Sequence, residues 1–296
     1  MSAGKDHLDR LAMALLVVLC AVWGVQQVAI KVANGGISPL FQSGLRSLGA
    51  TVLVGLWAYG RRVPLFRRDG TLPAGLLVAA LFATEFGLIY WGLTYTTASR
   101  GVIFLYTAPF FVALGAVVFL PQENIRRAQW LGMGLAFAGI VALFGENLLH
   151  PAGRAWIGDL MLFAAAALWA ATTLAIKASP LARAAPEKTL LYQLAGSAVL
   201  LPLFSWLLGE PGVTDPSGPV LLALAFQIGV VASASYLAWF WLIRHYPATR
   251  LSSFSFLTPV FGVLAGGALL GETLTPAVWL ALGLVGAGIW IANRPG

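Results

Sequence analysis

The sequence predicts an all-α integral membrane protein in which ten transmembrane helices form two five-helix repeats of inverted topology. Three observations support this fold class. Hydrophobic residues make up 59% of the 296 residues and charged residues only 10%, whereas a soluble domain has roughly 25% charged residues. Apolar runs of about 20 residues, the length that crosses the hydrocarbon core of a bilayer, follow one another with short polar breaks. The sequence of the first half also recurs in the second half.

Hydropathy and turn chemistry together place the predicted spans. Segments rich in Gly, Pro and charged residues separate them, such as "NGGISP" after the first span, "RRVPLFRRDG" after the second and "EPGVTDPSGP" after the seventh. The first run is longer than the apolar region of a typical signal peptide and lacks a convincing cleavage site, so we expect a retained helix. The ten spans cover residues 11–33, 38–60, 72–94, 98–120, 127–145, 156–178, 187–209, 218–243, 248–270 and 275–293.

The internal repeat is visible in two pairs of segments. The segment "ASRGVIFLYTAPFFVAL", which begins at Ala98, is answered by "ATRLSSFSFLTPVFGVL", which begins at Ala248. Upstream, "AVWGVQQVAIK" ends at Lys31 and "ALWAATTLAIK" ends at Lys177. Trp, Ala, Ile and Lys recur in the same order, so we interpret the chain as two copies of one unit.

The positive charges orient the spans and therefore the repeats. We place the two copies at residues 1–150 and 151–296, with five spans in each. With a cytoplasmic N-terminus, the inner side receives 14 of the 18 Lys and Arg residues and the outer side 4, as the positive-inside rule requires. The odd number of spans makes the second copy begin on the opposite face of the membrane. We therefore expect a multi-pass protein of the inner (plasma) membrane with both termini cytoplasmic, whose net charge of +7 indicates no nucleic-acid partner.

Inverted repeats are typical of secondary transporters, which bind substrate near the midplane between the repeats and alternate access by rocking one bundle against the other. The alternative is a repeat that serves helix packing only. Gly-rich segments such as "GMGLAFAG" and "GLVGAG" favour close packing of neighbouring helices, and we assign their glycines to packing. The inversion itself favours transport.

Several segments resemble a known family. "WGVQQVAIKVA" in the first span and "FLTPVFGVLAGGALLGETLTPAVWLALGLVGAGIWIA" in the last two are similar to the EamA repeat of the drug/metabolite transporter superfamily, and the resemblance covers nearly the whole chain. In the second copy, Ala195 stands opposite Arg46, so one basic residue of the pattern is lost. Within the superfamily the chain resembles the YddG-like exporters of aromatic and other amino acids, which implies export of small metabolites. The positions of the repeat's hallmark residues are occupied by Trp23, Lys31, Arg46, Pro109, Pro259 and Glu272.

Glu85 is a carboxylate inside the third span. Its repeat mate is Ser235, so the repeat itself does not need a carboxylate at this position. Intramembrane carboxylates are costly and face a polar cavity or a partner. Two interpretations stay open: Glu85 binds the amino group of a substrate or carries a proton, or it pairs structurally with a neighbouring helix, through Arg46 or a Tyr hydroxyl.

Polar and aromatic residues near the midplane are the other candidates for substrate binding. Gln26 and Gln27 are mirrored in the second copy by Thr172 and Thr173, and one member of each pair is expected to face the cavity. Mid-span rings beside a polar cavity stack on aromatic or cationic substrates, although many Trp and Tyr residues belong to interfacial belts. For a membrane-helix Ser, a hydrogen bond to its own backbone is the alternative. The predicted substrate-binding residues are Trp23, Gln26, Gln27, Glu85, Tyr90, Trp169, Thr172, Thr173, Tyr236, Trp239 and Ser253.

Pro109 and Pro259 occupy matched points in the fourth and ninth spans. Proline removes a backbone donor and kinks a helix, which is useful where two bundles bend around a site. We predict gating or hinge positions here, with a static kink that aids packing as the alternative.

Motifs for other classes of protein are lacking in the sequence. His7, His150 and His245 sit at tails or loop ends, so we expect no metal site, and there is no P-loop, so we expect no ATP hydrolysis and no cofactor. A membrane enzyme needs paired carboxylates, a His or an activated nucleophile at depth, whereas only Glu85 is clearly buried.

We therefore predict a monomeric secondary transporter, not an enzyme, that exports small metabolites, above all aromatic and other neutral amino acids. The alternatives are a membrane-embedded enzyme, a channel or receptor, or a carrier for drugs, sugar phosphates or nucleotide sugars. Phosphorylated substrates are less favoured because Arg46 is the one deep cation in the predicted spans, and a phosphate group generally needs more than one basic partner.

Overall fold

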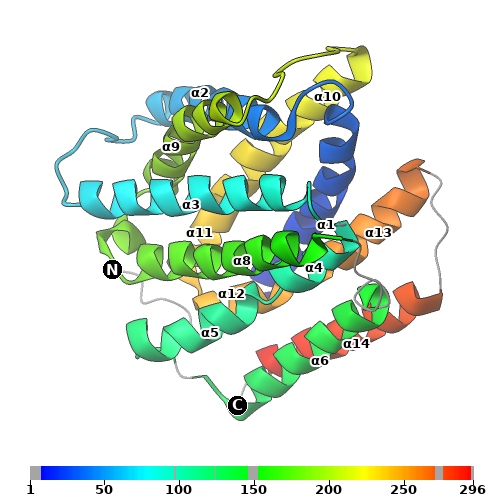
Figure 1. The fold of residues 1–296 in the computed structure, drawn as a ribbon. Coiled ribbons are helices and arrows are strands. Elements are labelled where there is room, and N and C mark those ends of the chain that lie inside the picture. Colours follow the sequence, from blue (N-terminus) through cyan, green and yellow to red (C-terminus); the bar gives the residue numbers. More distant parts are fainter. Residues whose placement is uncertain (1–7, 97, 124, 146–152, 271–275, 295–296) are drawn as a thin grey trace.

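Helices make up the regular structure of the part of the chain that the computed structural model describes, residues 8–96, 98–123, 125–145, 153–270 and 276–294 (Figure 1). Within these residues, nine helical stretches are long and apolar enough to cross a membrane, which confirms the prediction of an all-α membrane protein. The predicted second span falls on a helix of 22 residues that is not one of the nine, because polar side chains line one of its faces. His7, His150 and Glu272 lie outside the described residues.

The described helices follow the predicted spans to within a few residues at most ends. Their bounds are α1 (Arg10–Ala33), α2 (Pro39–Gly60), α3 (Leu72–Gly92), α4 (Ala98–Leu105), α5 (Ala108–Phe119), α6 (Arg127–Phe144), α8 (Ala155–Lys177), η1 (Pro180–Arg183), α9 (Pro186–Leu207), α10 (Gly218–Phe226), η2 (Gln227–Ser235), α11 (Tyr236–His245), α12 (Ala248–Phe254), α13 (Leu257–Leu270) and α14 (Pro276–Asn293).

Two predicted spans are broken rather than continuous, each just before a proline. The fourth span is divided into α4 and α5, and the ninth into α12 and α13. A proline lacks the N–H that would bond to the carbonyl four residues earlier, and its ring clashes with that carbonyl. For Pro109 this carbonyl belongs to Leu105, the last residue of α4, and for Pro259 it belongs to Ser255, the residue directly after the end of α12 at Phe254. The breaks therefore follow from the proline chemistry that the sequence indicated.

The eighth predicted span contains a π-helix, η2, between α10 and α11. Its wider turns let Ser233 Oγ donate to the carbonyl of Ile228 at 2.7 Å, five residues earlier. π-helical turns are rare and often lie at functional sites. Here the π-helix ends at Ser235, directly before Tyr236, and so sets the direction in which α11 presents its first aromatic residues.

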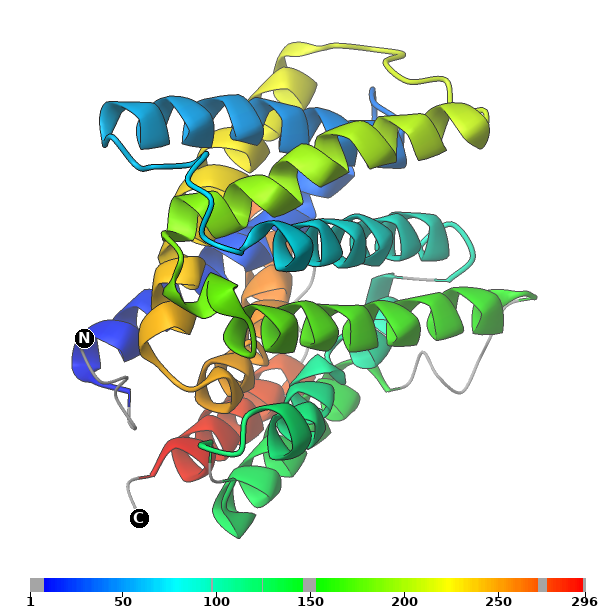
Figure 2. The ribbon, with the colours of Figure 1, turned by 90° about the vertical axis from the view of Figure 1, so that its left-hand side faces the viewer.

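Two helix pairs form opposite edges of the molecule, α2 with α9 and α6 with α14 (Figures 1 and 2). α3 and α8 pack side by side between these edges, while α1 packs against α13. The α6–α14 contact is close because Gly132 and Gly288 face each other: a Cβ on either would lie 2.4 Å from the carbonyl oxygen of the other. Small residues allow such backbone contacts in membrane proteins, as the Gly-rich segments predicted.

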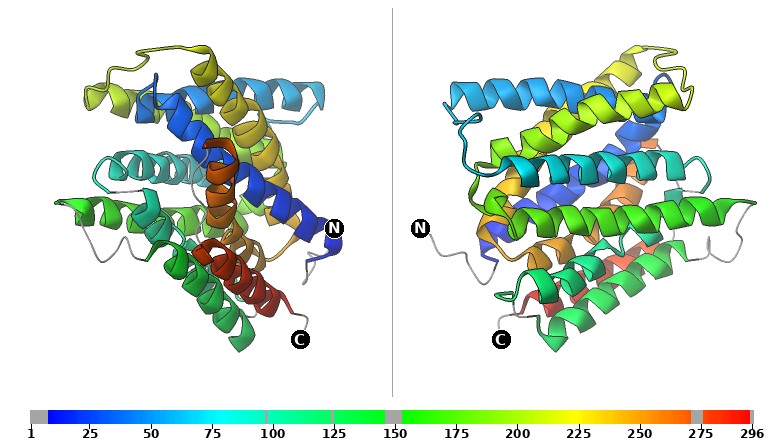
Figure 3. Two further views of the ribbon diagram at one scale, coloured as in Figure 1. Left: turned by 90° about the vertical axis from the view of Figure 1, so that its right-hand side faces the viewer. Right: turned by 60° about the vertical axis from the view of Figure 1, so that its left-hand side comes forward.

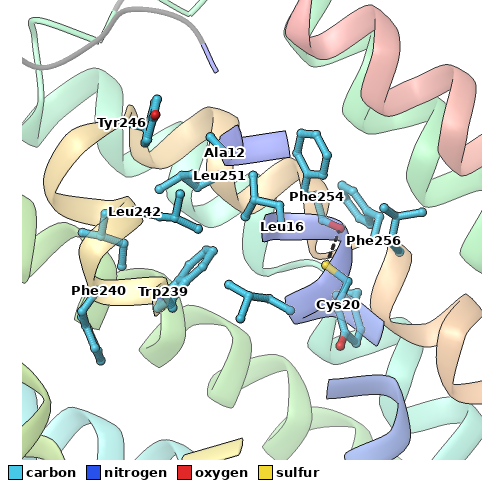
Figure 4. Close-up of a cluster of buried hydrophobic side chains, with 14 of the residues drawn as sticks. Ala12, Leu16, Cys20, Trp239, Phe240, Leu242, Tyr246, Leu251, Phe254 and Phe256 are labelled. Atoms are coloured by element: carbon cyan, nitrogen blue, oxygen red, sulfur yellow. Dashed lines mark hydrogen bonds between the residues drawn. The ribbon is translucent and has the colours of Figure 1, made fainter. Parts of the chain in front are cut away.

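A buried apolar cluster joins α1 to α11 and α12 (Figure 4). Leu16 and Leu251 are fully buried in it, and the Sγ of Cys20 donates to the backbone carbonyl of Phe254 at 3.2 Å. The start of α1 and the end of α14 lie at the same end of the bundle (Figure 3). This cluster holds α1 and α11, which carry several of the predicted site residues, in fixed relative positions.

Charged side chains pair near the ends of the helices rather than along them. At the beginning of α8, Asp159 forms an ion pair and two hydrogen bonds with Arg100 and also accepts a hydrogen bond from Thr96 Oγ1 at 2.7 Å. In the α2–α3 connection, Asp69 pairs with Lys188 of α9 at 2.9 Å. Hydrogen bonds from Thr71 and Lys188 lower the pKa of Asp69 to about 2.

Candidate functional site

A cavity of about 200 Å³ lies among α1, α3, α4, α8 and α11. Its wall extends from Ile30 and Leu93, near the ends of α1 and α3, to Ile176 and Ile243, near the ends of α8 and α11. Small-molecule sites are concave, mostly apolar and furnished with a few polar groups. The cavity has this character, with aromatic and aliphatic side chains over most of its surface.

Ten of the eleven predicted substrate-binding residues line this cavity, although they come from four helices far apart in the sequence. α1 contributes three of them, α3 two, α8 three and α11 two. The ten are Trp23, Gln26, Gln27, Glu85, Tyr90, Trp169, Thr172, Thr173, Tyr236 and Trp239.

Ser253 is the predicted residue that the structure does not bring to the cavity. Its hydroxyl donates to the carbonyl of Arg250 at 2.8 Å, within α12, and accepts a hydrogen bond from Asn293 of α14 at 3.1 Å. It is only 2% exposed. The backbone hydrogen bond is the ordinary role of Ser in a membrane helix, so we do not include Ser253 in the proposed site.

Aromatic rings form one connected wall of the cavity. The ring of Trp23 stands edge-on to Tyr236 and Trp239, with centroids 6.4 and 5.4 Å away. Trp23 Nε1 donates to the hydroxyl of Ser235 at 2.9 Å, which fixes the orientation of the indole. On another side, Trp169 stands edge-on to Tyr106 at 6.1 Å. Such edge-to-face pairs leave ring faces available to stack on a ligand.

Glu85 is the one acidic residue among the described residues that line the cavity, and no basic residue lines it. Its side chain is 6% exposed. The structure gives it no ion pair among the described residues, so the alternative interpretation, a structural ion pair with Arg46, is not what the structure shows. A buried carboxylate that faces a cavity without a protein partner is suited to bind a cationic group of a ligand.

The Gln and Thr pairs are arranged less simply than the sequence suggested. Both members of each pair line the cavity, whereas we expected one of each pair. Gln26, Thr172 and Thr173 are buried, while Gln27 is exposed. The hydroxyl of Thr172 has no hydrogen-bond partner among the described residues. These amides and hydroxyls supply both donors and acceptors to whatever occupies the cavity.

Some lining residues were not among the predicted site residues. Gln193 reaches the cavity from α9, Thr258 from α13, and Tyr106 from the break between α4 and α5. The break itself, marked by Pro109, was the available signal for Tyr106. Gln193 carries no such signal, because one Gln in an apolar helix does not reveal which neighbour it faces. Pro109 and Pro259 each lie shortly after a helix break. Tyr106, from the first of these breaks, lines the cavity.

A polar network links several helices at one end of the bundle. Glu123, from the α5–α6 connection, accepts hydrogen bonds from the backbone N–H groups of Ala248 and Thr249 at 2.8 and 3.1 Å, and so caps α12. Lys177 at the end of α8 lies 3.7 Å from the Glu123 carboxylate and donates to the carbonyl of Tyr246. Carboxylates stabilise helix N-termini in this way. The network joins segments from both halves of the sequence below the cavity.

The chain matches the profile of the EamA-like transporter family twice, over residues 10–145 and over residues 156–294. It belongs to the EamA-like transporter family. The EamA-family resemblance seen in the sequence is thereby confirmed. This EamA-family protein is a membrane transporter, with the bilayer and a small-molecule substrate as its partners.

Relatives of this EamA-family transporter carry transporter names. A probable amino-acid metabolite efflux pump of Salmonella typhimurium strain LT2 is 31% identical over 290 residues, 94% of this chain and 93% of that protein. A protein of the same name in Escherichia coli K12 is 29% identical over 287 residues, 94% of this chain and 93% of that protein. An uncharacterized inner membrane transporter of Escherichia coli K12, YedA, is 26% identical over 274 residues, 91% of this chain and 86% of that protein.

A solved crystal structure shares the fold of this EamA-family transporter. Its TM-score is 0.83 at 20% sequence identity, with 96% of this chain and 97% of that chain covered. At this identity the similarity establishes the helical architecture and says nothing of substrate.

Proposed function

We propose that this EamA-family transporter exports small zwitterionic metabolites, above all aromatic and other neutral amino acids, by alternating access around the cavity. The observation that carries the proposal is Glu85, a buried carboxylate that faces the cavity between aromatic walls and has no ion-pair partner among the described residues. A substrate ammonium group would bind the carboxylate, and an apolar or aromatic side chain would pack against Trp23, Tyr236 and Trp239. The names of two relatives, probable amino-acid metabolite efflux pumps, support the same class.

We propose further that ten transmembrane helices form two inverted repeats, residues 1–150 and 151–296. The packing supports this arrangement, because for several pairs of helices in contact the repeat mates of the two helices are also in contact. α1 packs against α13 and, correspondingly, α8 packs against α4 and α5. α3 packs against α9, while α2 packs against η2. The matched breaks before Pro109 and Pro259 are then hinges, and the Glu123 network closes one entrance while the other opens.

The proposed orientation puts both termini and the α2–α3 connection in the cytoplasm, on the positive-inside argument. Arg68→Cys and Asp215→Cys, each in a Cys20→Ala background, are expected to react with a membrane-impermeant thiol reagent from opposite sides of the membrane. Both positions are exposed, so access of the reagent is limited by sidedness alone. Labelling of both cysteines from outside intact cells would contradict the topology.

Two other classes of function are less well supported. A membrane-embedded enzyme needs a second carboxylate, a His or an activated nucleophile beside the first, and the described cavity wall holds Glu85 as its one such group. The match to the EamA-like transporter family favours a carrier over a channel. We propose neither.

The substrate class is tested with purified protein in proteoliposomes and a panel of labelled solutes. We expect exchange of phenylalanine, tryptophan, tyrosine and other neutral amino acids without ATP. Empty liposomes and liposomes that contain the Glu85→Ala variant serve as controls. Transport of sugar phosphates or nucleotide sugars, with no amino acid moved, would replace the proposed substrate class with another.

A further inference from the structure

Behind the cavity wall, α2 presents a buried polar face to which the proposed function assigns no role. Arg46 follows Gln42 by four residues and Ser43 by three, so its side chain lies on the same side of the helix as each of them, and all three residues are 0% exposed. The guanidinium carbon of Arg46 lies 4.3 Å from the ring centroid of Phe86, a residue of the cavity wall. A buried charge in a membrane helix normally has a partner and marks a functional site.

Several buried polar groups around Arg46 have no hydrogen-bond partner among the described residues. Among the described residues, none of the three guanidinium nitrogens of Arg46 has a hydrogen-bond partner, and neither do the hydroxyls of Ser43 and Tyr90. Tyr90, from α3, approaches both Ser43 and the charge of Arg46. Gln42 Oε1 also has no partner among the described residues, whereas the Gln42 amide Nε2 donates to Asn34 at 2.9 Å. The hydroxyls of Ser43 and Tyr90 can accept as well as donate.

Glu85 does not neutralise this positive charge. Arg46 and Glu85 interact electrostatically, yet the structure forms no ion pair between these two described residues. A guanidinium and a carboxyl group therefore lie near each other, both buried and neither in an ion pair among the described residues. A zwitterion placed between them would satisfy both at once.

We infer that Arg46 is the carboxylate-binding residue of the transporter, with Tyr90 and Ser43 as further donors, so that the protein selects a substrate by its carboxylate as well as by its amino group. The inference rests on the proposed function and names which substrates of that class fit. A planar guanidinium binds a carboxylate through two parallel N–H···O bonds. Stacking on Phe86 occupies one face of the guanidinium and leaves its N–H edges available.

In the proposed site, a substrate carboxylate would have to reach Arg46 past two aromatic side chains of the cavity wall. Phe86 and Tyr90 both line the cavity, and their ring centroids are 6.4 Å apart. Rotation of either ring about its side-chain torsions admits a carboxylate to the guanidinium. Tyr90 would then turn its hydroxyl to the bound carboxylate, where the hydroxyl acts as a donor.

The test compares three competitors that differ at one end: phenylalanine, phenylalaninamide and phenethylamine. Each is measured as an inhibitor of labelled phenylalanine exchange in proteoliposomes. In the wild type, phenylalanine is expected to compete at least about tenfold better than the other two, since a charge-assisted hydrogen-bonded pair discriminates by that order. Arg46→Gln is expected to reduce the discrimination to about twofold or less, while Arg68→Gln, an exposed arginine outside the cavity, leaves it unchanged.

Tyr90→Phe and a binding measurement keep the inference testable where Arg46→Gln does not fold. Tyr90→Phe removes one hydroxyl only, and we expect it to lower the discrimination roughly three- to tenfold. Discrimination equal to wild type in Tyr90→Phe, and in Arg46→Gln where it folds, would overturn the carboxylate site while the exporter proposal stands. If the wild type moves no amino acid, thermal stabilisation by 3-phenylpropionate decides. Stabilisation that Tyr90→Phe weakens would support the carboxylate site without the proposed substrate class, and no stabilisation would overturn both.

Discussion

Glu85→Gln is expected to raise the apparent KM for neutral amino acids by at least about tenfold, because a substrate ammonium loses its charged partner inside a buried cavity. The change keeps the size and shape of the side chain. We expect the loss in exchange down a substrate gradient and in proton-driven accumulation alike, since no second carboxylate and no His, Lys or Arg among the described residues lines the cavity to complete a proton relay. An uncharged analogue that lacks the amino group should suffer much less.

Two controls separate the roles that Glu85 could have. Glu85→Asp keeps the charge and should recover part of the apparent affinity, whereas Glu187→Gln, which removes a carboxylate outside the cavity wall, should behave as wild type. Loss of proton-driven accumulation with normal exchange would instead make Glu85 a proton carrier. Wild-type behaviour of Glu85→Gln in both assays would contradict any role in transport.

Asp159→Asn is expected to destabilise the protein by about 3 kcal/mol, the lower end of the range for breaking a buried ion pair. Asp159 forms an ion pair with the guanidinium of Arg100 and accepts a hydrogen bond from the hydroxyl of Thr96. The side chains of Arg100 and Asp159 are both less than a tenth exposed. The amide retains hydrogen-bonding capacity but not the charge. Thermal unfolding in detergent micelles should show a midpoint roughly 5–10 °C lower.

Asp215→Asn is the matched control for this substitution, since Asp215 is exposed and surface charges contribute little. Its unfolding midpoint should stay within about 1–2 °C of wild type. Equal midpoints for Asp159→Asn and Asp215→Asn would show that the Arg100–Asp159 pair does not hold α4 against α8. A lower midpoint with an unchanged apparent KM would mean that the ion pair contributes to stability and not to substrate binding.

The repeated sequence was informative about which helices surround the cavity. "AVWGVQQ" and "ALWAATT" recur with a Trp and a polar pair at the same spacing, and residues of both segments line one cavity: Trp23 and Gln26 from α1, Trp169 and Thr172 from α8. A polar pair at matched positions of two helices is predictable because the proposed inverted repeat would place both helices beside the same midplane.

What the sequence did not reveal depends on the rotation and spacing of helices. Ser253 was a predicted site residue, but in α12 its hydroxyl bonds to Arg250 and Asn293 and does not line the cavity. The sequence offered Arg46 as a partner for Glu85. That the two do not pair, and that Arg46 instead lies over Phe86, depends on distances between α2 and α3. Such distances follow from packing across helices, which local composition does not encode.

Counterflow in proteoliposomes tests the central proposal, alternating access of amino acids through this cavity, most directly. Vesicles are loaded with unlabelled phenylalanine, and entry of labelled phenylalanine from a dilute external solution is followed at zero membrane potential. We predict transient accumulation of label above its equilibrium level, which disappears in empty liposomes and is strongly reduced in Glu85→Gln. Label that rises only to equilibrium at any internal concentration, or no entry of any amino acid, would contradict the account.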